Sequence, residues 1–458
     1  MTAESPLIHA KVVDALNRCL RGTVVRPGDP RFAIGRRVWN AAIDRRPAAL
    51  VMCDDAEDVA LAVRIAADHG IAVTARGGGH NVAGRSVADG ALLLDLSRLR
   101  AVVVNEHARV AVVQGGALWH DVDLATADVG LATTGGLVSS TGVGGFTLGG
   151  GTGWLMRRHG LAIDNLLAAS VVLADGRFVR ASATENAELF YGLRGGAGGF
   201  GVVTSFEFQL HPLRLVLAGL IVRRPTEARD ALRVFRDFAS AAPDEFCGVT
   251  VIAHAPPLPF LSAAWHGHPV VILAFCWCGE PGAGERALEP LHRFGSPLAV
   301  NLGQMPYVQW QHILDGGAPA GRQQYWKNAT FDALSEETIG VLAAAANDLP
   351  TGCSEVHVQH LGGAVARTPE PDTAFASRRA KFFINLIGTT PWSEEFGEVR
   401  ERVKRLHDRL APSALPAMLP NFSDRDDSDV TARLDAVRVQ RIGSLRRRYD
   451  PQGLFVSG

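Results

Sequence analysis

Two glycine-rich segments of the chain have the composition of anion-binding loops. The first is Arg76-Gly-Gly-Gly-His80, and the second spans residues 135–153. Backbone N–H groups can approach a phosphate closely where no Cβ stands in the way. The second segment also carries interleaved apolar residues such as Val143 and Phe146, which a flexible Gly/Ser linker would lack. We therefore expect an ordered loop system without helix or strand, because glycine is costly inside both, that holds an extended anionic cofactor.

Neither segment matches the common nucleotide-binding fingerprints. Gly144-Gly-Phe-Thr-Leu-Gly149 has the wrong glycine spacing for a Rossmann loop, and no acidic residue follows at the usual distance. The chain contains no Gly-Lys-Ser/Thr sequence, which excludes a P-loop.

A third candidate for chemistry is the alternating stretch Glu355-Val-His-Val-Gln359. In a β-strand, residues two apart point to the same face, so Glu355, His357 and Gln359 should lie side by side. A carboxylate beside an imidazole could accept a proton from a substrate. The alternative is that this face is simply a solvated side of a sheet.

A zinc site is the next possibility, since Cys276-Trp-Cys278 closely follows His266-Gly-His268. These spacings do not match the usual structural zinc patterns. The run from Val270 to Cys278 also reads as one buried strand, where cysteine behaves as a small hydrophobic residue. We expect no metal.

The elements that must position these residues change in character along the chain. Up to His211-Pro212, a helix over 55–69 and short strands over 71–75, 91–96, 110–113, 166–174 and 202–209 are predicted. From there to about residue 415, strands over 249–253, 270–278, 356–361 and 381–387 alternate with helices over 229–240, 285–294 and 335–348. A last helix is predicted over 429–449.

Composition limits the class of protein. The chain has 458 residues, a formal net charge of −1, 47% hydrophobic and 20% charged residues, as expected for more than one globular domain. Without a basic run, nucleic acid is not an expected partner. No segment has the roughly 18 consecutive apolar residues of a membrane span, and the N-terminus does not read as a secretory signal. The six scattered cysteines do not form a disulfide framework, so a cytoplasmic protein is expected.

Several long motifs resemble those of the berberine-bridge-enzyme-like FAD-linked oxidoreductases, of bacterial type. They are, in order, Arg76-Gly-Gly-Gly-His-Asn-Val-Ala-Gly84, Thr141-Gly-Val-Gly-Gly-Phe-Thr-Leu-Gly-Gly-Gly-Thr-Gly-Trp154, His159-Gly-Leu161, Asp164-Asn165, Leu193-Arg-Gly-Gly-Ala-Gly-Gly-Phe-Gly-Val-Val-Thr204, Asn421-Phe422 and Leu445-Arg-Arg-Arg-Tyr-Asp-Pro-Gln-Gly-Leu-Phe455. The resemblance covers essentially the whole chain. It implies an α+β fold with a two-part PCMH-type FAD-binding domain, of the vanillyl-alcohol-oxidase superfamily, and a substrate domain whose antiparallel sheet is backed by helices. The FAD domain would take residues 1–211, the substrate domain 212–415, and a C-terminal segment, 416–458, would return to the FAD domain.

The same resemblance implies FAD bound covalently through His80, whose neutral imidazole would bond the flavin 8α carbon. Many relatives attach the flavin a second time, through a cysteine four residues before the first glycine of the long loop. That position is Val138, so a single linkage is expected. The full set of residues expected to bind FAD is Arg76, Gly77, Gly78, Gly79, His80, Asn81, Gly84, Ser86, Gln114, Thr141, Gly142, Gly144, Gly145, Thr147, Gly150, Gly151, Trp154, Asn165, Gly201, Val203 and Asn421.

The catalytic base is where the chain departs from the pattern. Relatives often carry tyrosine or glutamate two residues before the asparagine that matches Asn421, whereas this chain has Leu419, which cannot accept a proton. The candidates to replace it are Glu355, His357, Gln359, Tyr325 and Asn385.

The expected function is an oxidase that removes hydride from a hydroxyl- or amine-bearing small molecule, such as a sugar or secondary metabolite, with dioxygen as acceptor. Thr141 precedes the first glycine of the long loop, where relatives with a valine-sized residue admit oxygen to the flavin. A flavin-linked dehydrogenase and a flavin-retaining binding protein without redox activity are the alternatives.

Overall fold

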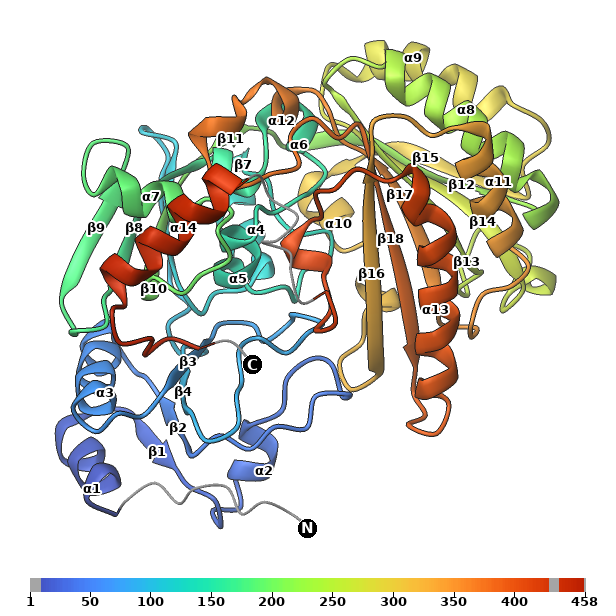
Figure 1. Ribbon diagram of the computed structural model, residues 1–458. Helices are drawn as coiled ribbons and strands as arrows, with labels where there is room; N and C mark the ends of the chain where they lie inside the picture. The colour runs from blue at the N-terminus through green and yellow to red at the C-terminus, as the bar shows by residue number, and fades with distance from the viewer. Residues whose placement is uncertain (1–9, 428–435, 457–458) are drawn as a thin grey trace.

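The computed structural model describes residues 10–427 and 436–456, and three large β-sheets organise them (Figure 1). A four-stranded and a five-stranded sheet use residues up to Gln209, and a seven-stranded sheet begins at Leu215. The predicted α+β fold, with two sheets in the first part of the chain and an antiparallel sheet backed by helices in the second, is confirmed.

The four-stranded sheet has the order β1-β2-β4-β3, with β1 antiparallel to β2 and the other pairs parallel. The predicted helix over 55–69 is confirmed as α3, and Asp55 caps it by accepting a hydrogen bond from the Asp58 backbone N–H at 2.8 Å. This part of the chain contains β1 (Thr23–Val25), β2 (Ala49–Met52), β3 (Val73–Arg76), β4 (Leu92–Asp95), α1 (Ala10–Cys19), α2 (Phe32–Gly35) and α3 (Ala56–Asp68). Because β3 ends at Arg76, the first glycine-rich segment leaves the sheet directly at the end of a parallel strand.

The five-stranded sheet is antiparallel and has the order β5-β6-β10-β8-β9. A two-stranded sheet, β7 with β11, lies at the junction with the rest of the chain. Their elements are β5 (Val102–Asn105), β6 (Val110–Gln114), β7 (Leu131–Ala132), β8 (Leu166–Val172), β9 (Phe178–Ser182), β10 (Val202–Gln209), β11 (His211–Pro212), α4 (Trp119–Ala127), α5 (Val143–Leu148), α6 (Met156–His159) and α7 (Ala187–Leu193).

The seven-stranded sheet is antiparallel throughout, in the order β15-β12-β14-β13-β17-β18-β16. Its strands are β12 (Leu215–Arg223), β13 (Phe246–His254), β14 (Pro269–Trp277), β15 (Ala299–Pro306), β16 (Gln323–Phe331), β17 (Glu355–His360) and β18 (Phe382–Thr390). The helices of this part are α8 (Ala228–Ala241), α9 (Pro281–Arg293), α10 (Tyr307–Gln311), α11 (Glu336–Ala345), α12 (Ala364–Arg367) and α13 (Phe396–Leu410).

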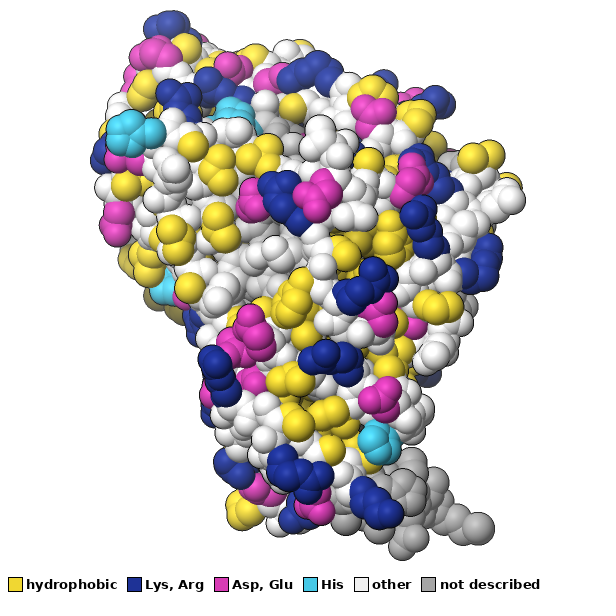
Figure 2. Space-filling view, turned by 90° about the vertical axis from the view of Figure 1, so that its left-hand side faces the viewer, with side chains coloured by type: hydrophobic (Ala, Val, Ile, Leu, Met, Phe, Trp, Pro, Cys, Tyr) yellow, Lys and Arg dark blue, Asp and Glu magenta, His cyan; other side chains and the backbone are white. Residues whose placement is uncertain are grey.

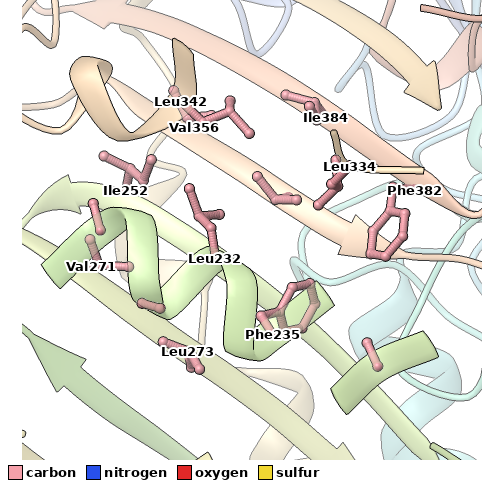
Figure 3. Close-up of a cluster of buried hydrophobic side chains, with 14 of the residues drawn as sticks. Leu232, Phe235, Ile252, Val271, Leu273, Leu334, Leu342, Val356, Phe382 and Ile384 are labelled. Carbon is pink, nitrogen blue, oxygen red and sulfur yellow. The ribbon is translucent and has the colours of Figure 1, made fainter. Parts of the chain in front are cut away.

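Helices α8, α9, α11 and α13 cover one face of this sheet (Figure 1). Leu232 and Phe235 on α8 pack against strand residues such as Val271, Leu273 and Val356 (Figure 3). The apolar part of the other face packs against residues from the first part of the chain, including Trp154. Both faces of the sheet are therefore packed, and only the polar part of the second face is left to contribute to a site.

The C-terminal part of the chain returns to the first two sheets. Ile442 and Leu445 of α14 (Ala436–Tyr449) are buried in the same core as Phe206 and Phe208 of β10. Further on, Phe455 forms a parallel bridge with Val73 of β3. Of the helix predicted over 429–449, residues 429–435 lie outside the described residues, and the rest is confirmed.

The expectation that the second glycine-rich segment contains no helix is wrong. Residues Val143–Leu148 form α5, which begins after Gly142. Val143 and Phe146 are buried in the core of the five-stranded sheet, and this packing compensates the entropy that glycine loses in a helix.

Candidate functional site

A central cavity of about 880 Å³ lies between the glycine-rich segments, the C-terminal segment and one strand of the seven-stranded sheet. Its wall includes Gly195–Gly199, Trp326 of β16, and Pro420, Asn421 and Phe422. Of the residues predicted to bind FAD, those that line the cavity are Gly77, Gly78, Gly79, His80, Asn81, Ser86, Thr141, Gly142, Gly144, Gly145, Gly201, Val203 and Asn421. The structure thus brings together segments more than 300 residues apart at one site.

The two glycine-rich segments touch each other backbone to backbone. A Cβ added at Gly78 would lie 2.6 Å from both Cα and N of Gly142, and one added at Gly142 would lie 2.3 Å from N of Gly78. No side chain could fit between the two loops at these positions. Gly145, in contrast, borders open space, with nothing within 4 Å of an added Cβ. The backbone is therefore bare on the side that faces the cavity, as an anion-binding loop requires.

His80 lies at the end of the first glycine-rich segment with its ring stacked on Trp39. The ring centroids are 4.3 Å apart and the planes differ by 17°. Trp39 is itself held by its indole N–H, which donates to the Ala318 carbonyl at 3.1 Å. Burial lowers the pKa of His80 to about 4, so its imidazole is neutral at ordinary pH. The Nε2 atom is buried and has no hydrogen-bond partner among the described residues. A neutral, immobilised imidazole at the cavity wall can act as a nucleophile.

These residues fit FAD. Ser86 Oγ and Thr152 Oγ1 border the cavity, are buried and have no hydrogen-bond partner among the described residues, so they can bind polar groups of a ligand. Apolar side chains such as Phe206 and Ile442 line other parts of the same cavity. An extended molecule with an anionic diphosphate, hydroxyl groups and flat apolar rings matches this combination.

The other residues predicted to bind FAD do not line the cavity: Arg76, Gly84, Gln114, Thr147, Gly150, Gly151, Trp154 and Asn165. The Arg76 guanidinium forms a buried ion pair with Asp95, at 2.6 Å, so it fixes the end of β3. Gly151 N donates to the Asn421 side chain at 3.2 Å, which ties the second glycine-rich segment to the C-terminal segment. Arg76 and Gly151 thus hold the segments around the cavity in place without lining it.

The side chains of β17 alternate as predicted. Val356 and Val358 pack in the core under the helices, so Glu355, His357 and Gln359 point to the opposite face. Asn385 of β18 is paired in register with His357 and lies on that face too. Trp326 of β16, which lines the cavity, points to the same face. One strand, β18, lies between Trp326 and Glu355. Four of the five candidate catalytic residues therefore lie on the same sheet face as the cavity-lining Trp326, although none of them is part of the cavity lining.

Tyr325 does not join them. Its ring is buried in the core under the helices, and its hydroxyl donates to Asp426 Oδ2 at 2.7 Å. Adjacent residues of a strand point to opposite faces, so the exposure of Trp326 to the cavity places Tyr325 on the wrong face.

Within this face, His357 Nε2 lies 2.6 Å from Glu355 Oε2. Both side chains are only partly exposed, at 13% for His357 and 26% for Glu355. Gln359 Oε1 and Asn385 Oδ1 are buried and lack hydrogen-bond partners among the described residues. The pair and the two amides form a polar patch that can accept protons and hydrogen bonds from a substrate.

Leu419 and Val138, which occupy the positions where relatives often carry a base and a second flavin-attaching cysteine, lie in different surroundings. Leu419 is buried in the core beneath the sheet and is not part of the cavity lining. Val138 does line the cavity, and none of the six cysteines, all described and all free, does so.

No group of three or more metal-ligating side chains occurs among the described residues. Cys276 and Cys278 are buried, and burial raises the pKa of the Cys278 thiol to about 11, which disfavours a thiolate ligand. In the described ranges, no helix is long and apolar enough to span a bilayer. On the molecular face of Figure 2, Lys and Arg are interspersed with Asp and Glu, without a large region of one sign.

Sequence reasoning missed the aromatic side of the site. Trp39 packs edge to face with Trp326 at 5.6 Å, and Trp326 stacks on Phe422 at 6.2 Å. It also missed Arg85 and Arg446, which line the cavity. These residues come from five separate segments of the chain. No local pattern distinguishes four of them, and for Trp326 the side-chain alternation of a strand over Gln323–Phe331 could have been the signal.

Comparisons with known proteins agree with this site. A family model described as an FAD binding domain matches residues 47–182. The chain is 28% identical over 455 residues to an FAD-linked oxidoreductase of Dictyostelium discoideum, covering 97% of this chain and 95% of that protein. It is 28% identical over 454 residues to the (R)-6-hydroxynicotine oxidase of Paenarthrobacter nicotinovorans, covering 95% of each.

A similar solved structure is that of wild-type BBE-like 1 from Physcomitrella patens, with a TM-score of 0.87, 21% identity and coverage of 97% of both chains. The chain thus carries an FAD-binding domain of the PCMH type. It is an FAD-linked oxidoreductase.

Proposed function

We propose that this protein is an oxidase that takes hydride from a hydroxyl- or amine-bearing carbon of a small molecule and passes the electrons to dioxygen. In this proposal, residues 1–211 and 416–458 hold FAD and residues 212–415 supply the substrate site. The observation that carries it is the position of the central cavity, which borders both the glycine-rich segments and the sheet that holds the Glu355–His357 pair. Bound FAD supplies a hydride acceptor that dioxygen can reoxidise.

His80 is the proposed attachment residue. Its neutral ring, fixed by Trp39, has the protonation state that bond formation with an electrophilic carbon requires. The attachment is single, because Val138 stands at the cavity wall where relatives have cysteine and none of the six cysteines lines the cavity.

The proposed proton acceptor is His357. With the Nε2–H donating to Glu355, the other ring nitrogen is left to accept the proton of a substrate O–H or N–H group. Glu355 orients the imidazole and stabilises its charged form.

This assignment predicts a slower chemical step in the His357→Ala variant. Flavin reduction under anaerobic conditions should fall by roughly 10²-fold or more, the usual contribution of a general base. The matched control is His107→Ala, an exposed histidine in the turn after β5, which should leave the rate unchanged. An unchanged rate in His357→Ala would remove the residue from the mechanism.

The experiment for the function itself is a panel of alcohols, sugars and cyclic amines, including hydroxylated pyridine alkaloids because of the nicotine-oxidising relative. Each compound is mixed anaerobically with the enzyme while the flavin absorption band is followed. A substrate bleaches the band, and aerated buffer should restore it within seconds with formation of hydrogen peroxide. Rapid recovery with a quinone dye but not with dioxygen would make the protein a dehydrogenase. No bleaching by any compound, with a flavin that dithionite still reduces, would favour a binding protein.

A further inference from the structure

Of the three arginines that line the central cavity, Arg447 is exposed and donates to Ser444 Oγ, whereas Arg85 and Arg446 are partly buried and have no counter-charge bound to them among the described residues. Arg85 follows Gly84 in the loop after His80, and Arg446 belongs to α14. In the described ranges, 10–427 and 436–456, neither forms an ion pair with a carboxylate. The Arg85 guanidinium makes no hydrogen bond there either. Arg446 donates only to main-chain carbonyls, those of Gly196 at 3.0 Å and Gly198 at 3.3 Å.

The charges of these side chains are partly removed from water. Burial lowers the pKa of both guanidinium groups, and for Arg446 the charge of Arg85 lowers it further, which means that the two positive charges are close enough to repel. Among the described carboxylates, Asp427 and Asp424 act on Arg85 without forming a hydrogen bond to it, and Asp427, which also lines the cavity, is already paired with Lys327. Two confined positive charges without a bound partner are stabilised by a ligand that carries two negative charges.

We propose that Arg85 and Arg446 bind the diphosphate group of FAD, adding charge neutralisation to the N–H groups of the glycine-rich segments. This inference rests on the proposed cofactor. Guanidinium groups bind phosphate oxygens through two parallel hydrogen bonds, and the FAD diphosphate supplies several such oxygens. Arg446 also fixes one cavity wall, since the carbonyls to which it donates belong to the Gly195–Gly199 loop. An anionic substrate bound to the same arginines is the competing occupant.

The test uses reversible binding, so it starts from the His80→Ala protein. The dissociation constants of FAD and riboflavin are measured by flavin fluorescence in this background and after adding Arg85→Gln or Arg446→Gln. Each arginine change should weaken FAD by roughly 10- to 100-fold, the usual range for a lost charged hydrogen bond. Riboflavin, which has no phosphate, should bind with unchanged affinity. The affinity for FAD should also fall with added salt in the parent and fall less in the double variant.

The matched control is Arg448→Gln, an exposed arginine of the same helix that does not line the cavity, and it should change neither constant. Arg85→Lys should recover part of the FAD affinity, because it keeps the charge and loses the two-pronged geometry. Equal losses for FAD and riboflavin would assign the arginines a purely structural role. Unchanged FAD affinity would overturn the inference and leave an anionic substrate as the occupant. A parent protein that binds neither flavin would instead contradict the proposed function.

Discussion

The burial of His80 predicts that covalent attachment of the flavin is nearly independent of pH in the mildly acidic range. Attachment requires the neutral ring, and the pKa of His80 is lowered from 6.5 to about 4. For a histidine with its ordinary pKa, the neutral fraction falls from about 90% at pH 7.5 to about 9% at pH 5.5. For His80 it stays above about 95% over the same interval. The expected change in attachment rate is therefore a few per cent and not tenfold.

The assay needs protein without flavin, produced in a host starved of riboflavin. This protein is mixed with saturating FAD at pH values from 5.5 to 7.5, and samples are quenched with acid and separated under denaturing conditions. Flavin fluorescence that stays with the protein gives the rate of attachment. His80→Ala gives the background, and FAD fluorescence quenching at each pH shows that binding stays saturated.

The reasoning is refuted by a rate that falls about tenfold between pH 7.5 and 5.5 with a midpoint near 6.5. Such a profile would mean that the ring titrates as it does in water, and that neither its burial nor its contact with Trp39 controls its protonation.

Three further predictions concern Trp39, Gly78 and His360. Trp39→Leu should slow attachment at saturating FAD by about tenfold, whereas Trp39→Phe, which keeps a ring over His80, should restore most of the rate; equal rates in both variants would exclude stacking as the cause. Gly78→Ala should lower the FAD content of the purified protein severalfold, because the new Cβ meets the backbone of Gly142 at 2.6 Å, while Gly352→Ala, with open space around it, should not. Burial also lowers the pKa of His360 to about 3, so below pH 6.5 the unfolded chain takes up a proton there that the folded chain does not. The free energy of unfolding should therefore fall as pH falls from 6.5, by up to about 1.4 kcal/mol per pH unit for this group. Urea unfolding of the wild type and of His360→Gln at pH 7 and pH 5 measures the difference, and identical pH dependence in the two proteins would contradict it.

The local part of the site could be predicted from sequence. Glycine loops that bind an anion need bare backbone, and that requirement is visible in residues 76–80 and 142–153 without knowledge of the fold. The shared face of Glu355, His357 and Gln359 follows from strand periodicity, which depends only on neighbouring residues.

The contacts between distant segments could not be predicted in this way. Trp39 reaches His80 because the backbone N–H of Gly321, from the seven-stranded sheet's side of the molecule, donates to its carbonyl. Arg76 belongs to the glycine motif, yet its side chain does not line the cavity, because it pairs with Asp95 of the neighbouring strand β4. Helix α5 forms despite the low helix propensity of its glycines, because Val143 and Phe146 are buried in the core of the five-stranded sheet. In each case the deciding partner belongs to another element, which no local pattern identifies.

The most direct test of the central claim, a flavin fastened to His80 in the central cavity, is mass analysis of the acid-denatured holoenzyme after proteolysis. We expect the flavin to stay with the protein on a single peptide that contains His80, and in His80→Ala we expect it to be released into the supernatant. Free FAD from the unmodified protein, or a flavin peptide that contains a cysteine, would contradict the account.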